Sequence, residues 1–189
     1  MVKQGRSTIL CGAALLLFTA FGDAADTDAS SFRCITSMTP VRQFYLDNLK
    51  GNLDATLAAA NSAGGAIYPP GSVIQLIPTE VMVKRDIGFD AKTRDWEFFL
   101  LSVSKDGAQI QKRGTVDVVN QIGNCFECHN AAAPQWDLVC ETNHGCAPLP
   151  ITTTMIRALQ RTDPRCGRPT SPEDAETLKQ LDALLKGLK

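Results

Sequence analysis

One pentapeptide, Cys125-Phe126-Glu127-Cys128-His129, combines two thiols and an imidazole at a spacing that favours one kind of chemistry. Two cysteines three positions apart can add to the two vinyl groups of a single haem, and the histidine that follows is then held at the iron. The segment therefore predicts one covalent haem c, bound through Cys125 and Cys128, with His129 as proximal iron ligand. The second ring nitrogen of His129 is expected to donate to a backbone carbonyl or a carboxylate.

The sixth iron ligand would decide what such a haem does, and the sequence leaves it open. His144 is the only other histidine, and its binding would give a bis-histidine site suited to electron transfer. Met82 and Met155 are thioether candidates, which would raise the reduction potential. Each has a commoner role, because loop histidines are usually solvated and methionines in apolar stripes usually pack in cores.

Without a sixth side chain, the distal face would admit a small ligand such as NO or CO. Phe89, Phe98 and Phe99 are candidates for the wall of that pocket. Glu97 is a weak candidate for a distal proton acceptor, since a positioned carboxylate can take protons from a bound amine. Solvent exposure is the commoner state of a glutamate at the start of a strand.

The remaining cysteines predict disulfides. The chain has seven cysteines. Cys11 lies in an N-terminal apolar run, and two belong to Cys125–His129, the predicted haem segment. The other four form an even set that suits an oxidising compartment and allows three pairings. We favour Cys140–Cys146 and Cys34–Cys166, although the spacing does not prove this choice.

A zinc site is the rival interpretation of these cysteines. Cys125, Cys128, Cys140 and Cys146 could supply four thiolates. Five residues separate the members of the second pair, where two to four are usual, and His129 would have no role.

Residues 1–25 are typical of a secretory signal. Lys3 and Arg6 precede an apolar run over 9–21, and small residues over 22–25 offer cleavage sites. The run is shorter than the roughly 20 residues of a membrane span. Export predicts a periplasmic protein, where haem attachment takes place in bacteria. The net charge of −1 and the absence of a basic stripe argue against nucleic acid as a partner.

The rest of the chain, 26–189, predicts one domain of helices and strands. Apolar residues at helical spacing, begun by Thr39-Pro40 and ended by Gly64-Gly65, predict a helix from 39. Apolar and alternating patterns predict four strands, followed by two helices. The strands are expected over 72–77, 79–84, 96–103 and 108–119, the last at an edge, and the helices over 153–160 and from 171.

Five segments carry a resemblance to a known family. In chain order they are Gly71-Ser72-Val73-Ile74, Asp95-Trp96-Glu97-Phe98-Phe99, Lys105-Asp106-Gly107, the haem segment and Trp136-Asp137-Leu138-Val139. Over roughly 65–140 the chain resembles the cytochrome P-460 and cytochrome c′-beta family of exported c-type haem proteins. The resemblance implies an α+β fold, with a mainly antiparallel sheet flanked by helices, haem packed against the sheet, and frequent homodimers.

Two features depart from that family. Its hydroxylamine-oxidising members carry a lysine joined to the haem ring soon after the Gly-x-Val-Ile strand, whereas the first lysine here is Lys84. Lys84 is therefore either the lysine joined to the haem ring, at a position shifted along the chain, or a solvated lysine. The cysteine-rich part after Cys140 is outside the family pattern, and we expect 141–189 to form a disulfide-linked helical tail.

The sequence thus favours a periplasmic monohaem cytochrome that exchanges electrons with a redox partner protein. The first alternative is a five-coordinate haem protein that binds NO or oxidises hydroxylamine-type small nitrogen compounds. The second is a non-redox exported module stabilised by disulfides or zinc.

Overall fold

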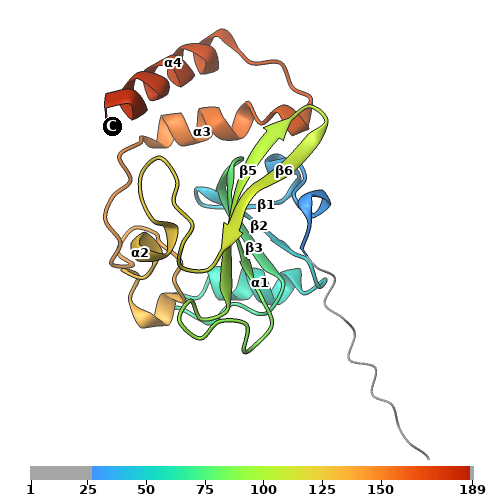
Figure 1. Cartoon of the computed structure of the whole chain (residues 1–189), viewed down its shortest axis with the longest axis vertical. Coiled ribbons are helices and arrows are strands. Elements are labelled where there is room, and N and C mark those ends of the chain that lie inside the picture. Colours follow the sequence, from blue (N-terminus) through green and yellow to red (C-terminus); the bar gives the residue numbers. More distant parts are fainter. Residues whose placement is uncertain (1–26, 188–189) are drawn as a thin grey trace, which may run out of the picture.

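A six-stranded antiparallel sheet forms the centre of the computed structural model, which describes residues 27–187 (Figure 1). The strands lie side by side in chain order, so each is joined to the next by a local connection. They are β1 (Thr39–Val41), β2 (Phe44–Asn48), β3 (Ser72–Ile77), β4 (Glu80–Lys84), β5 (Trp96–Ser104) and β6 (Gly107–Gly114). The predicted α+β class is confirmed.

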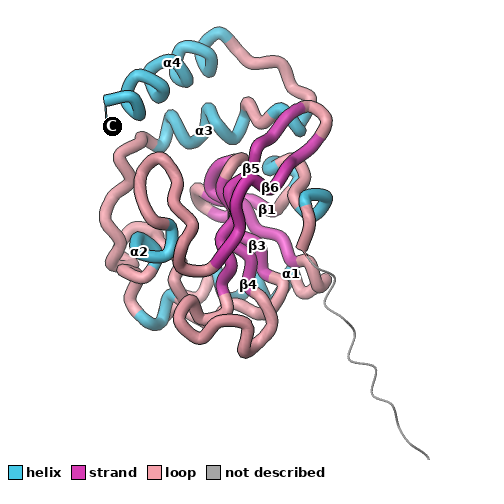
Figure 2. The backbone as a smooth tube through the Cα atoms, viewed as in Figure 1, coloured by secondary structure: helices cyan, strands magenta, loops and turns pink. Residues whose placement is uncertain are grey.

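Four α-helices accompany the sheet: α1 (Leu53–Ala60), α2 (Cys125–His129), α3 (Thr153–Arg161) and α4 (Pro172–Gly187). The chain after α2 runs largely as loop to α3, and α3 and α4 pack on each other (Figures 1 and 2). Short 3-10 helices complete the described chain: η1 (Ala29–Ser31), η2 (Ile35–Ser37), η3 (Pro134–Trp136) and η4 (Pro164–Cys166). Within 27–187 no helix has the length and apolarity needed to cross a bilayer.

The two faces of the sheet bury different apolar clusters, because successive strand residues point to opposite sides. Residues of one parity, including Leu46, Met82 and Phe98, pack with Phe126 of α2 and with α1. Residues of the other parity, including Val83 and Phe99, pack with Phe32 near the start of the described chain. The haem segment therefore lies on the Met82–Phe98 face of the sheet.

The helix predicted from Thr39 is wrong in its first half. Residues 39–41 and 44–48 are strands β1 and β2, joined by a turn in which Arg42 has a φ of 51°. Phe44, Leu46 and Asn48 alternate into the core, which is strand periodicity, and β2 pairs with β3. Pairing with a distant strand has outweighed a helical pattern that the sequence also supports. Only 53–60 is helical.

The other predicted elements are present with small shifts of their ends. The strands at 72–77, 79–84 and 96–103 correspond to β3, β4 and β5, and the helices at 153–160 and from 171 correspond to α3 and α4. The return strand β6 lies at the edge of the sheet as predicted, but it ends at Gly114 rather than at residue 119. The signal segment over 1–25 lies outside the described residues.

Candidate functional site

The single turn of helix α2 holds the two cysteines and the histidine of the haem segment on one side. Asn124 caps α2, since its side-chain oxygen accepts from the backbone N–H of Glu127 at 3.0 Å. Phe126 is buried in the core and fixes the helix to the molecule. Residues three and four positions apart share a helix face, so Cys128 and His129 lie on the same side as Cys125.

The ring of His129 is oriented by the backbone. Its Nδ1 lies 2.7 Å from the carbonyl oxygen of Leu138, and a carbonyl can only accept, so Nδ1 carries the proton. This confirms the predicted hydrogen bond and leaves the Nε2 lone pair available to a metal. The ring also packs against Phe98 of β5, with 5.4 Å between ring centroids. Burial lowers the pKa of His129, which favours the neutral, metal-binding form.

The two thiols of α2 are the cysteines left without a disulfide in residues 27–187. Cys125 is partly buried and Cys128 is exposed. Burial raises the pKa of Cys125 to about 11, and the carboxylate of Glu80 adds to this rise. Redox-active C-x-x-C pairs depend on a lowered thiol pKa, so Cys125 does not have the character of a redox nucleophile.

The other four described cysteines form the two favoured disulfides, Cys34–Cys166 and Cys140–Cys146. A paired sulfur is not a thiolate ligand, which disfavours the four-thiolate zinc site. A cluster of Cys34, Asp163 and Cys166 has ligand atoms close together, but its two sulfurs are those of a disulfide.

The structure places the three sixth-ligand candidates differently. Met82 is buried in β4, on the His129 face of the sheet and paired with Phe98. His144 stacks on Trp136 at 3.8 Å between centroids, and its Nδ1 lies 2.6 Å from the carbonyl oxygen of Val139. Met155 is partly buried on α3. Met82 is thus the candidate that shares an apolar cluster with Phe98, whose ring contacts His129.

Glu97 and Phe99 lie on the face of the sheet opposite to Phe98, which contacts His129. Glu97 is buried, whereas solvent exposure is the commoner state of a glutamate at the start of a strand. Its carboxylate accepts from Arg113 at 2.7 and 3.0 Å. Phe99 packs on Phe32 on that same face, and Phe89 is exposed. A distal role for Glu97 is therefore disfavoured, and Phe98 alone of the three phenylalanines contacts the histidine.

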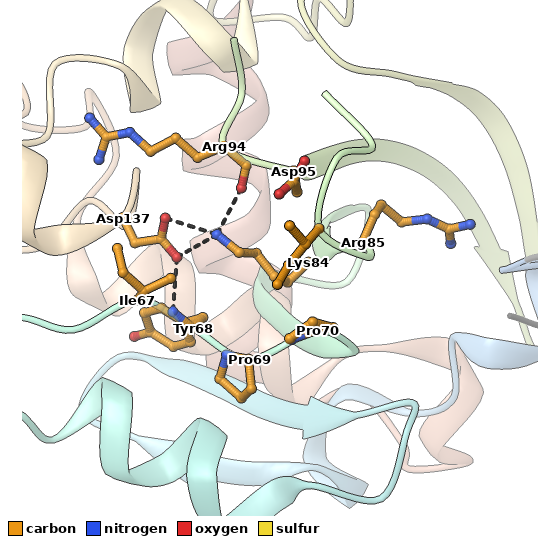
Figure 3. Close-up of a pocket in the computed structure, with 10 residues that line it drawn as sticks. Ile67, Tyr68, Pro69, Pro70, Lys84, Arg85, Arg94, Asp95 and Asp137 are labelled. Atoms are coloured by element: carbon orange, nitrogen blue, oxygen red, sulfur yellow. Dashed lines mark hydrogen bonds and ion pairs between the residues drawn. The ribbon is translucent and has the colours of Figure 1, made fainter. Parts of the chain in front are cut away.

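Lys84 is neither solvated nor unpaired. It is only 5% exposed, and its Nζ donates to both carboxylate oxygens of Asp137 at 2.7 and 2.9 Å and to the carbonyl oxygen of Arg94 at 2.7 Å. Burial lowers the pKa of Lys84, while Asp137 opposes that shift. The pair lines a pocket of about 420 Å³ beside Tyr68 and Pro69 (Figure 3). Lys84 lies on the His129 face of the sheet, as a haem cross-link would require, but its amine is engaged by Asp137.

Two residues of this region were not identified as functional from the sequence. Glu80 of β4 is a partly buried carboxyl that accepts from Asn120 at 2.9 Å and raises the pKa of Cys125. Asp137 has a fully buried side chain and was noted only as part of a family segment. An acidic residue within an otherwise apolar pattern was the available signal for both.

Comparisons with known protein families, with curated proteins and with solved structures find no match.

Proposed function

We propose that this protein is an exported monohaem c-type cytochrome that binds haem covalently through Cys125 and Cys128 and transfers electrons. The observation that carries the proposal is the state of α2. Its two thiols are left unpaired while the four other described cysteines form disulfides, and the neighbouring imidazole presents a free Nε2. Two thiols and one oriented histidine on a single helical turn are the donor set of a c-type haem.

The surroundings of α2 fit the same group. Phe98 and Met82 of the sheet and Phe126 of α2 form an apolar cluster beside the two cysteines and His129, and a haem held by α2 would lie next to it. When bound, the haem supplies one-electron redox chemistry. The protein's own part is to hold Nδ1–H of His129 on the Leu138 carbonyl, which fixes the ring and increases the basicity of Nε2.

A second candidate function follows from Met82 and His144. Both have ordinary structural contacts, since Met82 lies in the core and His144 stacks on Trp136. If neither reaches the iron, the site is five-coordinate and would bind NO or oxidise hydroxylamine-type compounds, as the resemblance to the cytochrome P-460 and cytochrome c′-beta family implies. A dimer and a haem cross-link through Lys84 belong to this proposal.

Expression with export and haem-attachment machinery tests the main proposal. The wild-type protein is expected to gain the mass of one haem and to stain for haem on a denaturing gel. Cys125→Ser with Cys128→Ser should lose the stain, while Cys140→Ser with Cys146→Ser should keep it. His129→Ala should keep the stain and change the absorption spectrum, because the proximal ligand is lost. Wild-type protein that carries no added haem mass would refute the proposal.

The same samples separate the two candidate functions. Sharp low-spin ferrous bands that do not respond to NO or CO indicate a six-coordinate electron carrier. A broad high-spin spectrum that shifts with either gas indicates an open site, and a strongly red-shifted ferrous Soret band indicates a ring cross-link.

A further inference from the structure

The carbonyl that orients His129 belongs to a backbone turn with unusual geometry. Asp137 has a φ of 50° and Leu138 a φ of 65°, so two successive residues with side chains adopt the left-handed conformation. That conformation is unfavourable for residues with a Cβ atom, and such residues persist where their surroundings fix them. Something outside the turn must therefore hold the Leu138 carbonyl in place.

The contacts of Asp137 supply that hold. Its carboxylate accepts from the Nζ of Lys84 at 2.7 and 2.9 Å and from the backbone N–H of Tyr68 at 2.9 Å, as Figure 3 shows. Its own carbonyl oxygen accepts from the indole Nε1 of Trp96 at 2.7 Å. The side chains of Asp137 and Lys84 are 0% and 6% exposed, so water does not compete for these bonds.

We infer that the Lys84–Asp137 ion pair is the positioning device of His129, because it fixes the turn whose Leu138 carbonyl receives the imidazole Nδ1–H. The chain of contacts runs from β4 through the Asp137 carboxylate to the Leu138 carbonyl and ends at the ring, 2.7 Å away. The inference deepens the proposed function and rests on it for the role of the ring as iron ligand. Lys84 and Asp137 are positioning residues, since neither contacts the ring itself.

Hydrogen exchange of the His129 Nδ1–H proton tests the inference. The measurement is made by nitrogen-edited NMR on the reduced haem-loaded protein, with CO added if the sixth position is open, so that the iron is low-spin. Asp137→Asn keeps the shape of the side chain and removes its charge. The proton is expected to exchange roughly ten- to hundred-fold faster, the range for loss of a hydrogen bond between charged groups.

The matched control is Glu97→Gln, which weakens the part-buried Glu97–Arg113 ion pair on the opposite face of the sheet. Its ring proton should exchange at the wild-type rate. Lys84→Met should accelerate exchange as Asp137→Asn does. Unchanged exchange in Asp137→Asn, or equal acceleration in Glu97→Gln, overturns the inference.

If the Asp137 and Lys84 variants do not fold, hydrogen exchange in the wild-type protein tests the inference instead. The backbone N–H of Tyr68 and the ring N–H of His129 are held by the same turn. They should therefore open together, with protection factors within about tenfold of each other. A ring proton that exchanges far faster than the Tyr68 amide overturns the inference.

Failure of the proposed function has a different signature. It appears as wild-type protein without haem on the denaturing gel. The exchange comparison can still be made on that haem-free protein, because the contacts from Lys84 to His129 are made by the chain alone.

Discussion

Glu80 is a partly buried acid whose charge acts on Cys125, and its protonation affects the stability of the fold. Burial raises the pKa of Glu80 above its ordinary value of 4.5, although the bond from Asn120 opposes the shift. The folded protein therefore holds this proton more tightly than the unfolded chain does. The stability that Glu80 contributes is fully present below its ordinary pKa and is lost as the pH rises through its folded pKa.

Glu80→Gln should therefore stabilise the protein at neutral pH, because glutamine keeps the polar group and never ionises. The free energy of unfolding in urea should match the wild type near pH 4, which lies below the ordinary pKa of 4.5. The variant should become the more stable protein as the pH rises to 7. Glu176→Gln, at an exposed position of α4, is the control, expected to stay within about 0.5 kcal/mol of wild type. A Glu80→Gln variant that is less stable at pH 7 contradicts the argument.

Residue roles were predictable where they depend on local spacing. Cys125, Cys128 and His129 lie within five positions, and the type of hydrogen-bond partner of His129 follows from general rules for ligating histidines. Asp137 was not predictable, because its partners Tyr68 and Lys84 are 69 and 53 positions away in the chain. The burial of Glu97 was missed for the same reason, since Arg113 is 16 positions away on the neighbouring strand.

At the scale of elements, α2 depends on its cap. Asn124 accepts from Glu127 N–H at 3.0 Å and donates to the carbonyl oxygen of Val116 at 2.8 Å, which also holds the preceding loop. Asn124→Ala should cost about 1–2 kcal/mol of unfolding free energy. It should also reduce the fraction of protein that stains for haem, because the two thiols are no longer held on one helix face.

Thr152→Ala is the matched control for that prediction. Thr152 caps α3 by accepting from the backbone N–H of Met155 at 3.2 Å, far from the haem segment in the chain. Its loss should lower stability by about 1 kcal/mol and leave haem staining unchanged. Equal staining in the two variants would show that the cap of α2 has no role in attachment.

Elements were predictable where one periodicity clearly dominates. The continuous apolar run of β5 and the helical stripe of α4 have no competing pattern. The region from Thr39 to Asn48 carries both a helical and an alternating pattern, and its pairing with β3 decides between them. That pairing joins residues such as Leu46 and Ile74, so no local window of sequence contains it.

At the scale of the whole molecule, two disulfides close loops of very different size. Cys34–Cys166 joins cysteines 132 positions apart and links the start of the described chain to η4. Cys140–Cys146 spans only six positions and closes a small loop after α2. The sequence allowed three pairings. The observed Cys34–Cys166 bond connects the segment before β1 with the helical tail, which no local pattern of the sequence shows.

The difference in loop size predicts a difference in stability. A covalent link restricts the unfolded chain more when the loop is longer, by about 5 kcal/mol for the long loop and about 2 kcal/mol for the short one. Cys34→Ser with Cys166→Ser should therefore lose about 3 kcal/mol more unfolding free energy in urea than Cys140→Ser with Cys146→Ser. Both variants replace two cysteines by serine, so each controls for the effect of that substitution in the other. Haem staining of both variants would show that haem attachment is intact. Equal losses would mean that native contacts around the sulfurs, and not restriction of the unfolded chain, determine what each disulfide contributes.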